Sequence, residues 1–358
     1  MEAFVERIVQ EVRREPGTLV LPMTDRTLLP LSSRREAVFE AGGQLVLSPH
    51  ETILRTTDKL QATQLAESLG IAVPQTALLT TEEQATVARS ARYPLVLKPR
   101  STEETSPAGR LLKTGGPAYA SCPAEFLSSY ESLRRRSSAV LVQDFVGGTG
   151  AGYFALLRDG EVRAEFAHQR VRDVLPTGSG SAVRISIPLD PRVRKAGSAI
   201  LRALGWHGVA MVEFRIRPDG TPVFLEVNGR FWNSLPLAVC AGVDFPALLT
   251  RMVEKGDVEG PDSYQVGVRC RWLLGDFRHL LQVWRGAPVG YPGQFPGRLA
   301  TAVRFFLPVP GTHHDNFTLL DPLPEVGDWV DFALRQLPEA INKGRGTNPS
   351  PETAKLHA

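Results

Sequence analysis

Two largely apolar runs, 209–217 and 222–228, flank Pro218-Asp219-Gly220-Thr221, and polar side chains recur in them at every second position, at 213, 215 and 217 and at 226 and 228. Such alternation is typical of β-strands, and a Pro-Asp-Gly sequence between two strands predicts a hairpin turn. The residues next to Glu213 and Glu226 are apolar on both sides, which indicates an interior strand pair. We therefore predict a buried hairpin with one glutamate on each strand.

The turn also sets the register of this hairpin. If its four residues form the loop, Arg217 faces Pro222, and counting inward places Glu213 directly opposite Glu226. Two facing carboxylates repel each other, and their burial without a partner costs free energy, so a cation is expected between them. The alternative is an ordinary solvated strand face with cross-strand ion pairs, and the apolar flanks favour the buried site.

A hard divalent cation would satisfy this pair of carboxylates. Mg²⁺ binds oxygen ligands and often combines one or two carboxylates with substrate phosphates. Asn228 and Arg230 project from the same face as Glu226, because side chains on a strand repeat every two residues. The hairpin therefore predicts half of a site for a metal ion and a nucleotide.

Helical and strand patterns alternate over the rest of the chain. Residues 18–22 and 44–48 are typical of short strands around a helix near 29–40, which predicts a βαβ unit and a parallel sheet. The chain opens on a helical pattern at 4–15, whereas a doubly wound domain normally opens on a strand. The first domain is therefore predicted to be incomplete.

The later elements follow the same periodicity rules. We expect helices at 57–70, 123–135, 191–204 and 235–254, and strands at 93–99 and 139–145. We also expect a polar loop or mobile flap at 101–116, and a hairpin spanning 153–171 that turns at Asp159-Gly160. Gly147–Gly152 is a weak dinucleotide signal, because that motif must open a helix and here a strand follows.

A second charged pattern lies on the strand near residue 170. His168, Arg170 and Arg172 alternate and share a face, and three cationic groups together suit an anion such as a triphosphate or a carboxylate. A solvated basic strand face is an equally good interpretation of this pattern taken alone.

The composition of the chain mainly excludes classes of function. The chain has 358 residues, 42% hydrophobic and 22% charged content, and a net charge of +3, which is too small to indicate a nucleic-acid partner. It has no apolar run long enough for a membrane span and no signal-peptide pattern at its start. Its three scattered cysteines, Cys122, Cys240 and Cys270, predict free thiols in the cytoplasm.

Several of these motifs together resemble a known family. In order and spacing, the chain is similar to the ATP-grasp superfamily through Lys59 in TDK, Lys98 in YPLVLKP, VLVQDFVGG, HQRVR, MVEF and LEVNGRFWNSLPLAVCAGVDFP. The resemblance covers roughly residues 18–255 and is nearest to carbamoyl-phosphate-synthase-like, stand-alone carboxylate–amine ligases. Its most specific part is the E-x-N-x-R element that begins at Glu226.

The resemblance implies a role for each matching residue. It implies magnesium ligation by Glu213, Glu226 and Asn228, contacts to the ATP phosphates by Lys59 and Lys98, adenine binding by the hinge Gln143, Asp144, Phe145 and Val146, and catalytic contacts by Arg230, Arg170 and the neighbouring His168. The implied cofactors are ATP and Mg²⁺, or Mn²⁺ in its place. The implied partners are a small-molecule carboxylate and an amine.

The same resemblance implies an α/β (α+β) fold and a division of the chain. The expected parts are an incomplete Rossmann-like pre-ATP-grasp domain at 1–75, a lid subdomain at 76–146, a core with the metal site at 147–260, a C-terminal appendage at 261–341 and a disordered tail at 342–358. The implied reaction forms an acyl phosphate from a carboxylate and ATP, and an amine then displaces phosphate.

The sequence also leaves an alternative open. The family usually has a glycine-rich flap after the Lys98 position, whereas residues 101–108 are STEETSPA. This altered flap, with two glutamates near the expected phosphates, and the incomplete N-terminal domain motivate a second hypothesis, an ATP-binding module without turnover. A bicarbonate-activating carboxylase is disfavoured, because no biotin-carrier segment is present in this sequence.

Overall fold

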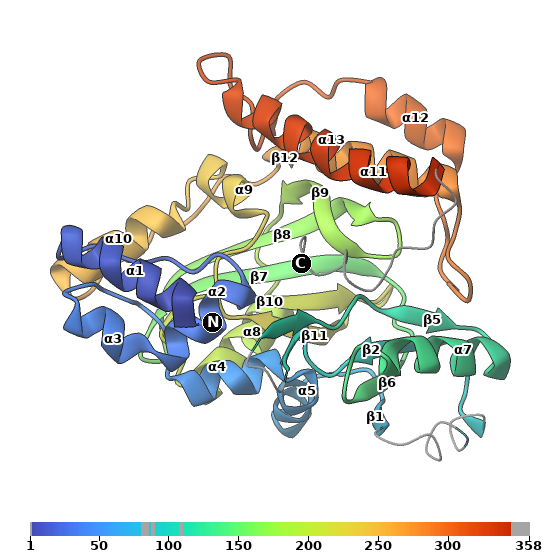
Figure 1. Ribbon diagram of the computed structural model, residues 1–358, viewed down its shortest axis with the longest axis horizontal. Helices are drawn as coiled ribbons and strands as arrows, with labels where there is room; N and C mark the ends of the chain where they lie inside the picture. Colours follow the sequence, from blue (N-terminus) through green and yellow to red (C-terminus); the bar gives the residue numbers. More distant parts are fainter. Residues whose placement is uncertain (1, 80–85, 87–89, 107–109, 345–358) are drawn as a thin grey trace.

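The computed structural model describes residues 2–79, 86, 90–106 and 110–344. A seven-stranded sheet forms its centre (Figure 1), in the order β11-β10-β7-β8-β9-β12-β13. These strands are β7 (Thr149–Arg158), β8 (Glu161–Leu175), β9 (Ser179–Ser186), β10 (Gly208–Ile216), β11 (Pro222–Asn228), β12 (Arg269–Arg271) and β13 (Thr312–His314). Neighbouring strands are antiparallel except β12 and β13, which run parallel. The hairpin predicted at Asp159-Gly160 is confirmed as β7–β8.

Helices cover both faces of this sheet, because its strands carry apolar side chains on both sides. On β7, Tyr153 and Ala155 belong to one buried core, whereas Phe154 and Leu156 belong to the other. The first core also includes residues of α1 (Glu2–Arg14), α2 (Asp25–Ser33), α3 (Arg35–Glu40), α4 (His50–Thr57), α5 (Lys59–Ser68) and α8 (Pro191–Ala203). The second core includes residues of α9 (Leu235–Cys240) and α10 (Phe245–Lys255).

The N-terminal segment differs from the predicted βαβ unit. In the described structure, the two runs expected as strands, 18–22 and 44–48, meet only at one parallel bridge between Leu19 and Gln44. Pro22 limits the first run, since a proline nitrogen cannot donate a hydrogen bond to a neighbouring strand. The helix expected between the runs is split into α2 and α3. The prediction of two strands is therefore wrong, and the segment is mainly a helical layer.

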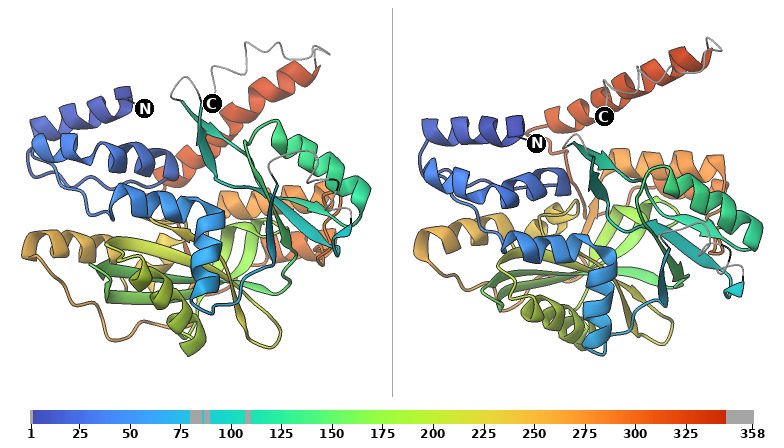
Figure 2. Two further views of the ribbon diagram at one scale, coloured as in Figure 1. Left: turned by 90° about the horizontal axis from the view of Figure 1, so that it is seen from below. Right: turned by 60° about the horizontal axis from the view of Figure 1, so that its bottom comes forward.

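A second sheet lies to one side of the central sheet (Figure 2). Its four antiparallel strands follow the order β1-β6-β2-β5. They are β1 (Thr76–Leu79), β2 (Leu95–Pro99), β5 (Ala118–Ala120) and β6 (Val140–Asp144). α7 (Pro123–Arg134) buries Phe126, Tyr130 and Leu133 against this sheet. We call the sheet and α7 the lid; the strands and the helix expected here are confirmed within one or two residues.

Two further strands, β3 (Glu103–Thr105) and β4 (Leu111–Lys113), form a small hairpin that we call the flap. The sequence predicted a polar loop or mobile flap over 101–116 and did not predict its two strands. Long-range contacts explain the difference. Arg26 of α2 donates to the carbonyl oxygen of Leu111 at 3.1 Å, and Glu104 accepts from the backbone N–H of Ser138 at 2.9 Å.

The C-terminal residues add both strands and helices. β12 and β13 extend the edge of the central sheet, α11 (Leu273–Arg285) packs against β8, and α12 (Arg298–Phe306) packs against α11. α13 (Leu323–Gly344) lies beside α11 (Figure 1), where Trp329 and Phe332 contact Phe277. Of the predicted disordered tail, residues 342–344 belong to α13 and residues 345–358 lie outside the described residues, as do residues 107–109 of the predicted loop.

Two expectations from composition can be compared with the structure. The three cysteines carry free thiols. In the described part of the chain, no helix combines the length and the apolar character needed to cross a membrane.

Candidate functional site

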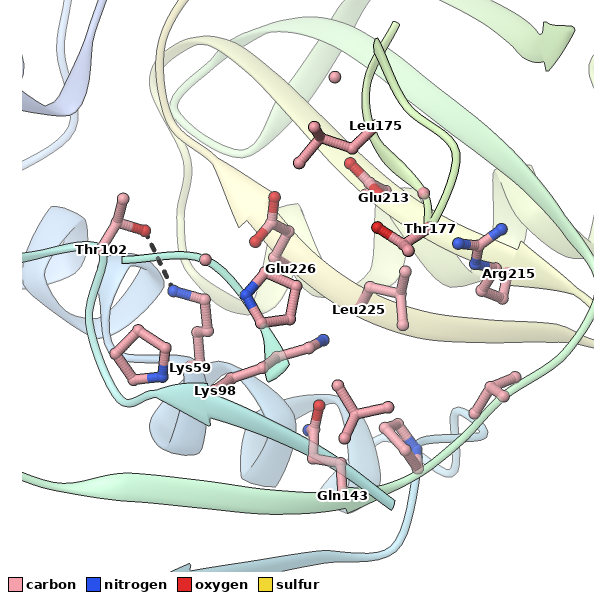
Figure 3. Close-up of a pocket in the computed structure, with 18 of the residues that line it drawn as sticks. Lys59, Lys98, Thr102, Gln143, Leu175, Thr177, Glu213, Arg215, Leu225 and Glu226 are labelled. Atoms are coloured by element: carbon pink, nitrogen blue, oxygen red, sulfur yellow. Dashed lines mark hydrogen bonds between the residues drawn. The ribbon is translucent and has the colours of Figure 1, made fainter. Parts of the chain in front are cut away.

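A cavity of about 480 Å³ lies between the lid, the flap and the central sheet. Eleven of the twelve site residues expected from the sequence line it. They are Lys59, Lys98, Gln143, Asp144, Phe145, Val146, Arg170, Glu213, Glu226, Asn228 and Arg230. Figure 3 shows Glu213 and Glu226 on the hairpin strands and the side chains of Lys59 and Lys98 on the other side of the cavity. The fold therefore brings together segments that lie far apart in sequence.

The facing glutamates predicted from the hairpin are confirmed, although the register differs near the turn. Glu213 pairs with Glu226, but Ile216 rather than Arg217 pairs with Pro222. The loop is thus one residue longer than expected, and a β-bulge at Leu225 compensates by adding one residue to β11. This bulged residue lines the cavity, as both glutamates do.

Glu213 is neutralised by an arginine from the neighbouring part of the sheet. Arg170 Nη2 donates to Glu213 Oε1 at 2.6 Å, and Arg170 Nε lies 3.2 Å from Asp173 Oδ1. The side chain of Arg170 is 6% exposed, so this contact is protected from solvent. Burial raises the pKa of Glu213, and the guanidinium of Arg170 opposes that rise.

Glu226 lies in a different electrostatic environment. Burial alone would raise the pKa of this carboxyl, but Lys59 and Lys98, together with Asn228 and Arg230, hold the pKa below its usual value. Glu226 Oε1 also accepts from Asn228 Nδ2 at 3.2 Å, and Asn228 Oδ1 accepts from Arg230 Nη2 at 3.1 Å. Glu226 is therefore ionised and surrounded by donors and cations.

The two lysines reach the cavity from separate elements. Asp58 caps α5 by accepting from the backbone N–H groups of Leu60 and Gln61, which fixes Lys59 in the first turn of the helix. Lys59 Nζ then donates to Thr102 Oγ1 at 3.1 Å (Figure 3). Lys98 lies on β2, where burial lowers its pKa although Glu226 and Glu213 act in the opposite direction. Both ammonium groups are placed to meet an anion in the cavity.

The expected hinge forms another part of the cavity wall. Gln143 and Asp144 end β6, and Phe145 and Val146 continue toward β7. The backbone N–H of Asp144 donates to the carbonyl oxygen of Gln75 at 3.1 Å, and the backbone N–H of Phe145 donates to the carbonyl oxygen of Pro94 at 3.2 Å. Fixed backbone next to apolar residues suits a flat heteroaromatic ring.

The basic strand does not form the three-cation cluster that its alternation predicted. A register shift between Arg170 and Arg172 sends the second arginine to Asp276, with Nε–Oδ1 at 2.7 Å. His168 does not line the cavity; it is buried, and its ring contacts Phe154 edge-on at 4.6 Å between centroids. Burial lowers the pKa of His168 well below its usual value. The structure therefore gives no support to the catalytic role expected for His168.

Several cavity residues were missed by the sequence reasoning. Arg215 follows Glu213 by two residues on β10, so the period of the strand could have identified it. Its Nη1 donates to the carbonyl oxygen of Gly148 at 3.2 Å, and a side chain at Gly178 would collide with its guanidinium. The sequence around Asp25 gave no sign that it belongs to the site. Asp25 lines the cavity from α2 and accepts from Arg230 Nε at 2.9 Å, a contact between residues far apart in the sequence.

The donor set fits a hard divalent cation better than a transition metal. Glu213, Glu226 and the amide oxygen of Asn228 supply only oxygen ligands, which suits Mg²⁺ when phosphate oxygens complete its coordination. Within the described residues, no group of three or more His, Cys, Asp or Glu side chains gathers in a metal-binding arrangement. A metal ion at this site would therefore depend on a bound phosphate for several of its ligands.

Comparison with known proteins adds independent information. A putative D-alanine–D-lactate ligase of Streptomyces coelicolor is 29% identical over 186 residues, which cover 48% of this chain and 51% of that protein. A β,γ-ATP complex of biotin carboxylase from Campylobacter jejuni superposes with a TM-score of 0.61 at 15% identity, over 74% of this chain and 60% of that one. An L-amino acid ligase from Bacillus licheniformis gives a TM-score of 0.52 at 19% identity, over 70% and 59%.

The coverage limits what these likenesses establish. The chain spans about half the length of the Streptomyces relative. No protein-family model matches the chain. The structural likenesses show a shared α/β fold, in agreement with the fold expected from the sequence.

Proposed function

Because this chain belongs to the ATP-grasp superfamily, we propose that it is an ATP- and Mg²⁺-dependent ligase that activates a carboxylate for attack by an amine. The observation that carries the proposal is the convergence of Glu213 and Glu226 with Lys59 and Lys98 on one cavity. Two facing carboxylates suit a divalent cation, and two lysines suit the phosphates that such a cation accompanies.

The residues divide into binding roles along the cavity. The hinge Gln143–Val146 would hold the adenine, and the ammonium groups of Lys59 and Lys98 would hold the phosphates. The carboxylates of Glu213 and Glu226, with the amide of Asn228, would hold Mg²⁺. When bound, Mg²⁺ supplies charge neutralisation to the phosphates.

The reaction needs positioning and charge stabilisation more than an activated side-chain nucleophile. A substrate carboxylate attacks the γ-phosphate to give an acyl phosphate and ADP, and the amine then displaces phosphate. Arg230 is held between Asp25 and Asn228, so its guanidinium is positioned for the anionic groups of this step. Arg170 is paired with Glu213, which places a second guanidinium beside the same centre.

The two flap glutamates are placed where they do not oppose phosphate binding in the large cavity. Glu104 turns toward Ser137 and Ser138, at 2.6 Å from Ser137 Oγ, and anchors the flap to the lid. Glu103 is buried beside Arg26 of α2. This arrangement favours the ligase over a module without turnover, because neither carboxylate is among the residues that line the large cavity.

The proposal is tested by trapping the activated carboxylate. The protein is incubated with Mg-ATP, hydroxylamine and pools of carboxylic acids, including amino acids, and ADP and acyl hydroxamate are measured. We expect ADP and hydroxamate in equal amounts with at least one pool, and none without carboxylate. Tight ATP binding without carboxylate-dependent ADP or hydroxamate in every pool would instead identify a nucleotide-binding module.

A further inference from the structure

Glu103 of the flap has an environment that the proposed ATP and metal sites do not explain. Its side chain is only 6% exposed, and its Oε2 has no hydrogen-bond partner. The nearest cation is Arg26 Nε at 3.4 Å, and the side chain of that arginine is 45% exposed. Burying a carboxylate oxygen without a hydrogen bond is costly even beside a cation, so this oxygen calls for an explanation.

Glu103 borders a small cavity next to the large one. This second cavity has a volume of about 20 Å³, and its charged lining residues are Asp25, Lys59, Glu103 and Glu226. Asp25, Lys59, Thr102, Glu226 and Asn228 line both cavities. A volume of this size holds one small polar group. Asp25 and Glu226 already have cationic partners in Arg230 and the two lysines, whereas Glu103 Oε2 accepts no hydrogen bond and is open to a donor.

The position of the small cavity relates it to the proposed reaction centre. Arg230 donates to Asp25 on one side and to Asn228 on the other, so Asp25 joins the small cavity to the proposed phosphoryl-transfer centre. A group held beside Glu103 and Asp25 would therefore lie next to the activated carboxylate. A primary ammonium fits, because it is small, cationic and carries three hydrogen-bond donors.

We propose that Glu103 binds the amino group of the attacking substrate and removes its proton, which makes the second substrate a primary amine. This inference rests on the proposed ligase function. One proton of the ammonium passes to the Glu103 carboxylate, and the nitrogen lone pair forms the C–N bond. The acyl C–O bond breaks, its electron pair leaves with phosphate, and the second excess proton goes to that phosphate.

The surroundings of Glu103 suit a base. Burial raises the pKa of this carboxyl, and Arg26 and Lys113 oppose that rise, while Asp25 adds to it. A carboxylate with a raised pKa accepts a proton more readily than an ordinary glutamate. The other charged groups that line its cavity are Lys59 and Glu226.

The test compares two nucleophiles on one variant. Glu103→Gln is assayed with the carboxylate that gives hydroxamate in the wild-type protein, using either hydroxylamine or a pool of primary amines. Hydroxylamine is largely unprotonated at neutral pH and needs no base, so its rate should stay near that of the wild type. Amide formation should fall by about 100-fold, the loss typical of removing a general base.

A pH profile and a matched variant distinguish a catalytic role of Glu103 from a structural one. In Glu103→Gln, amide formation should recover as pH rises, because more of the amine becomes neutral in solution. Glu104→Gln changes the adjacent flap glutamate, and it should keep the preference of the wild type between the two nucleophiles. Equal amide rates in the wild type and Glu103→Gln would overturn the proposal.

A parallel loss of hydroxamate and amide in a folded Glu103→Gln variant would also overturn it, since Glu103 would then serve ATP or the carboxylate. Failure of the ligase function itself has a different signature. The wild type would then form no hydroxamate from any carboxylate, and the role of Glu103 would fall together with that function.

Discussion

Two hairpins border the cavities, and each carries two glutamates. In the core hairpin, β10–β11, Glu213 and Glu226 lie on opposite strands and face each other across the pair. In the flap, Glu103 and Glu104 are consecutive on β3, so they point to opposite faces. One flap glutamate borders the small cavity, and the other binds the lid through Ser137 and Ser138.

The comparison shows that partners, rather than residue type, decide what a buried carboxylate does. Glu226 has Lys59 and Lys98 beside it, and its pKa is lowered although burial opposes that shift. Glu103 has a half-exposed arginine at 3.4 Å and Lys113 opposite it on the flap, yet burial raises its pKa. Glu226 is therefore suited to remain ionised beside a bound cation, whereas Glu103 is suited to exchange a proton.

The largest expected effect is on the rate of hydroxamate formation, which should differ between substitutions in the two hairpins. Glu226→Gln removes a charge from the proposed metal site, and we expect hydroxamate formation to fall by at least about 100-fold, as for other groups that stabilise transition-state charge. Glu103→Gln should leave hydroxamate formation nearly unchanged. Steady-state rates of both variants measure the contrast. Full hydroxamate formation by Glu226→Gln would contradict the metal assignment.

The second effect concerns nucleotide affinity. Lys98→Met removes a buried ammonium but keeps the apolar length of the side chain, and we expect the Kd for Mg-ATP to rise by about tenfold to 100-fold, the equivalent of one charged hydrogen bond. Titration calorimetry measures it, with Lys195→Met on α8, outside the cavity, as the control. An unchanged Kd for Lys98→Met would show that Lys98 does not contact phosphate.

The third effect is on stability, and it has opposite signs for Glu226 of the core hairpin and Glu103 of the flap. The folded-state pKa of Glu226 is lowered, so its charge stabilises the fold at neutral pH, and this contribution is lost as pH falls from 4.5. We expect Glu226→Gln to lower the free energy of unfolding at pH 7 by about 1–3 kcal/mol. The difference from wild type should shrink below pH 4.5.

Glu103 should show the reverse behaviour. Its folded-state pKa is raised above 4.5, so the fold is favoured when the carboxyl is protonated, and this advantage is lost as pH rises through the raised value. Glu103→Gln should therefore be as stable as the wild type, or more stable, at pH 7. Urea unfolding of both variants at pH 7 and pH 4 tests the pair. Equal destabilisation by both substitutions would remove the distinction between the hairpins.

The smallest expected effect concerns the attachment of the flap. Glu104→Ala removes acceptors for Ser137 and Ser138, and we expect a loss of about 1 kcal/mol confined to local opening of the flap. Hydrogen exchange of the backbone amides in β3 and β4 should become faster, while exchange in β10 and β11 stays the same. Faster exchange across both hairpins would indicate global destabilisation instead.

The core hairpin could be predicted from sequence because its signals are local. Alternation and a Pro-Asp-Gly turn identified the strands, and the facing of Glu213 and Glu226 followed from counting. The count succeeded through two compensating errors, since the loop is one residue longer and Leu225 forms a bulge. A bulge of this kind depends on the neighbouring structure rather than on its own sequence.

The parts that escaped prediction depend on contacts between distant segments. The flap strands form where Arg26 and Glu104 make bonds to residues 85 and 34 positions away. Asp25 enters the site only because α2 lies against the cavity. His168 was expected to contact an anion from its strand, but the sheet buries it against Phe154.

The most direct test of the central claim is the fate of a carboxylate oxygen. The carboxylate that supports hydroxamate formation is labelled with oxygen-18 and incubated with Mg-ATP and an amine, and the released phosphate is analysed by mass spectrometry. The proposed reaction transfers one labelled oxygen to each phosphate, because the carboxylate attacks the γ-phosphate before the C–O bond breaks. Unlabelled phosphate, with amide formed at the same rate, would contradict an acyl phosphate intermediate.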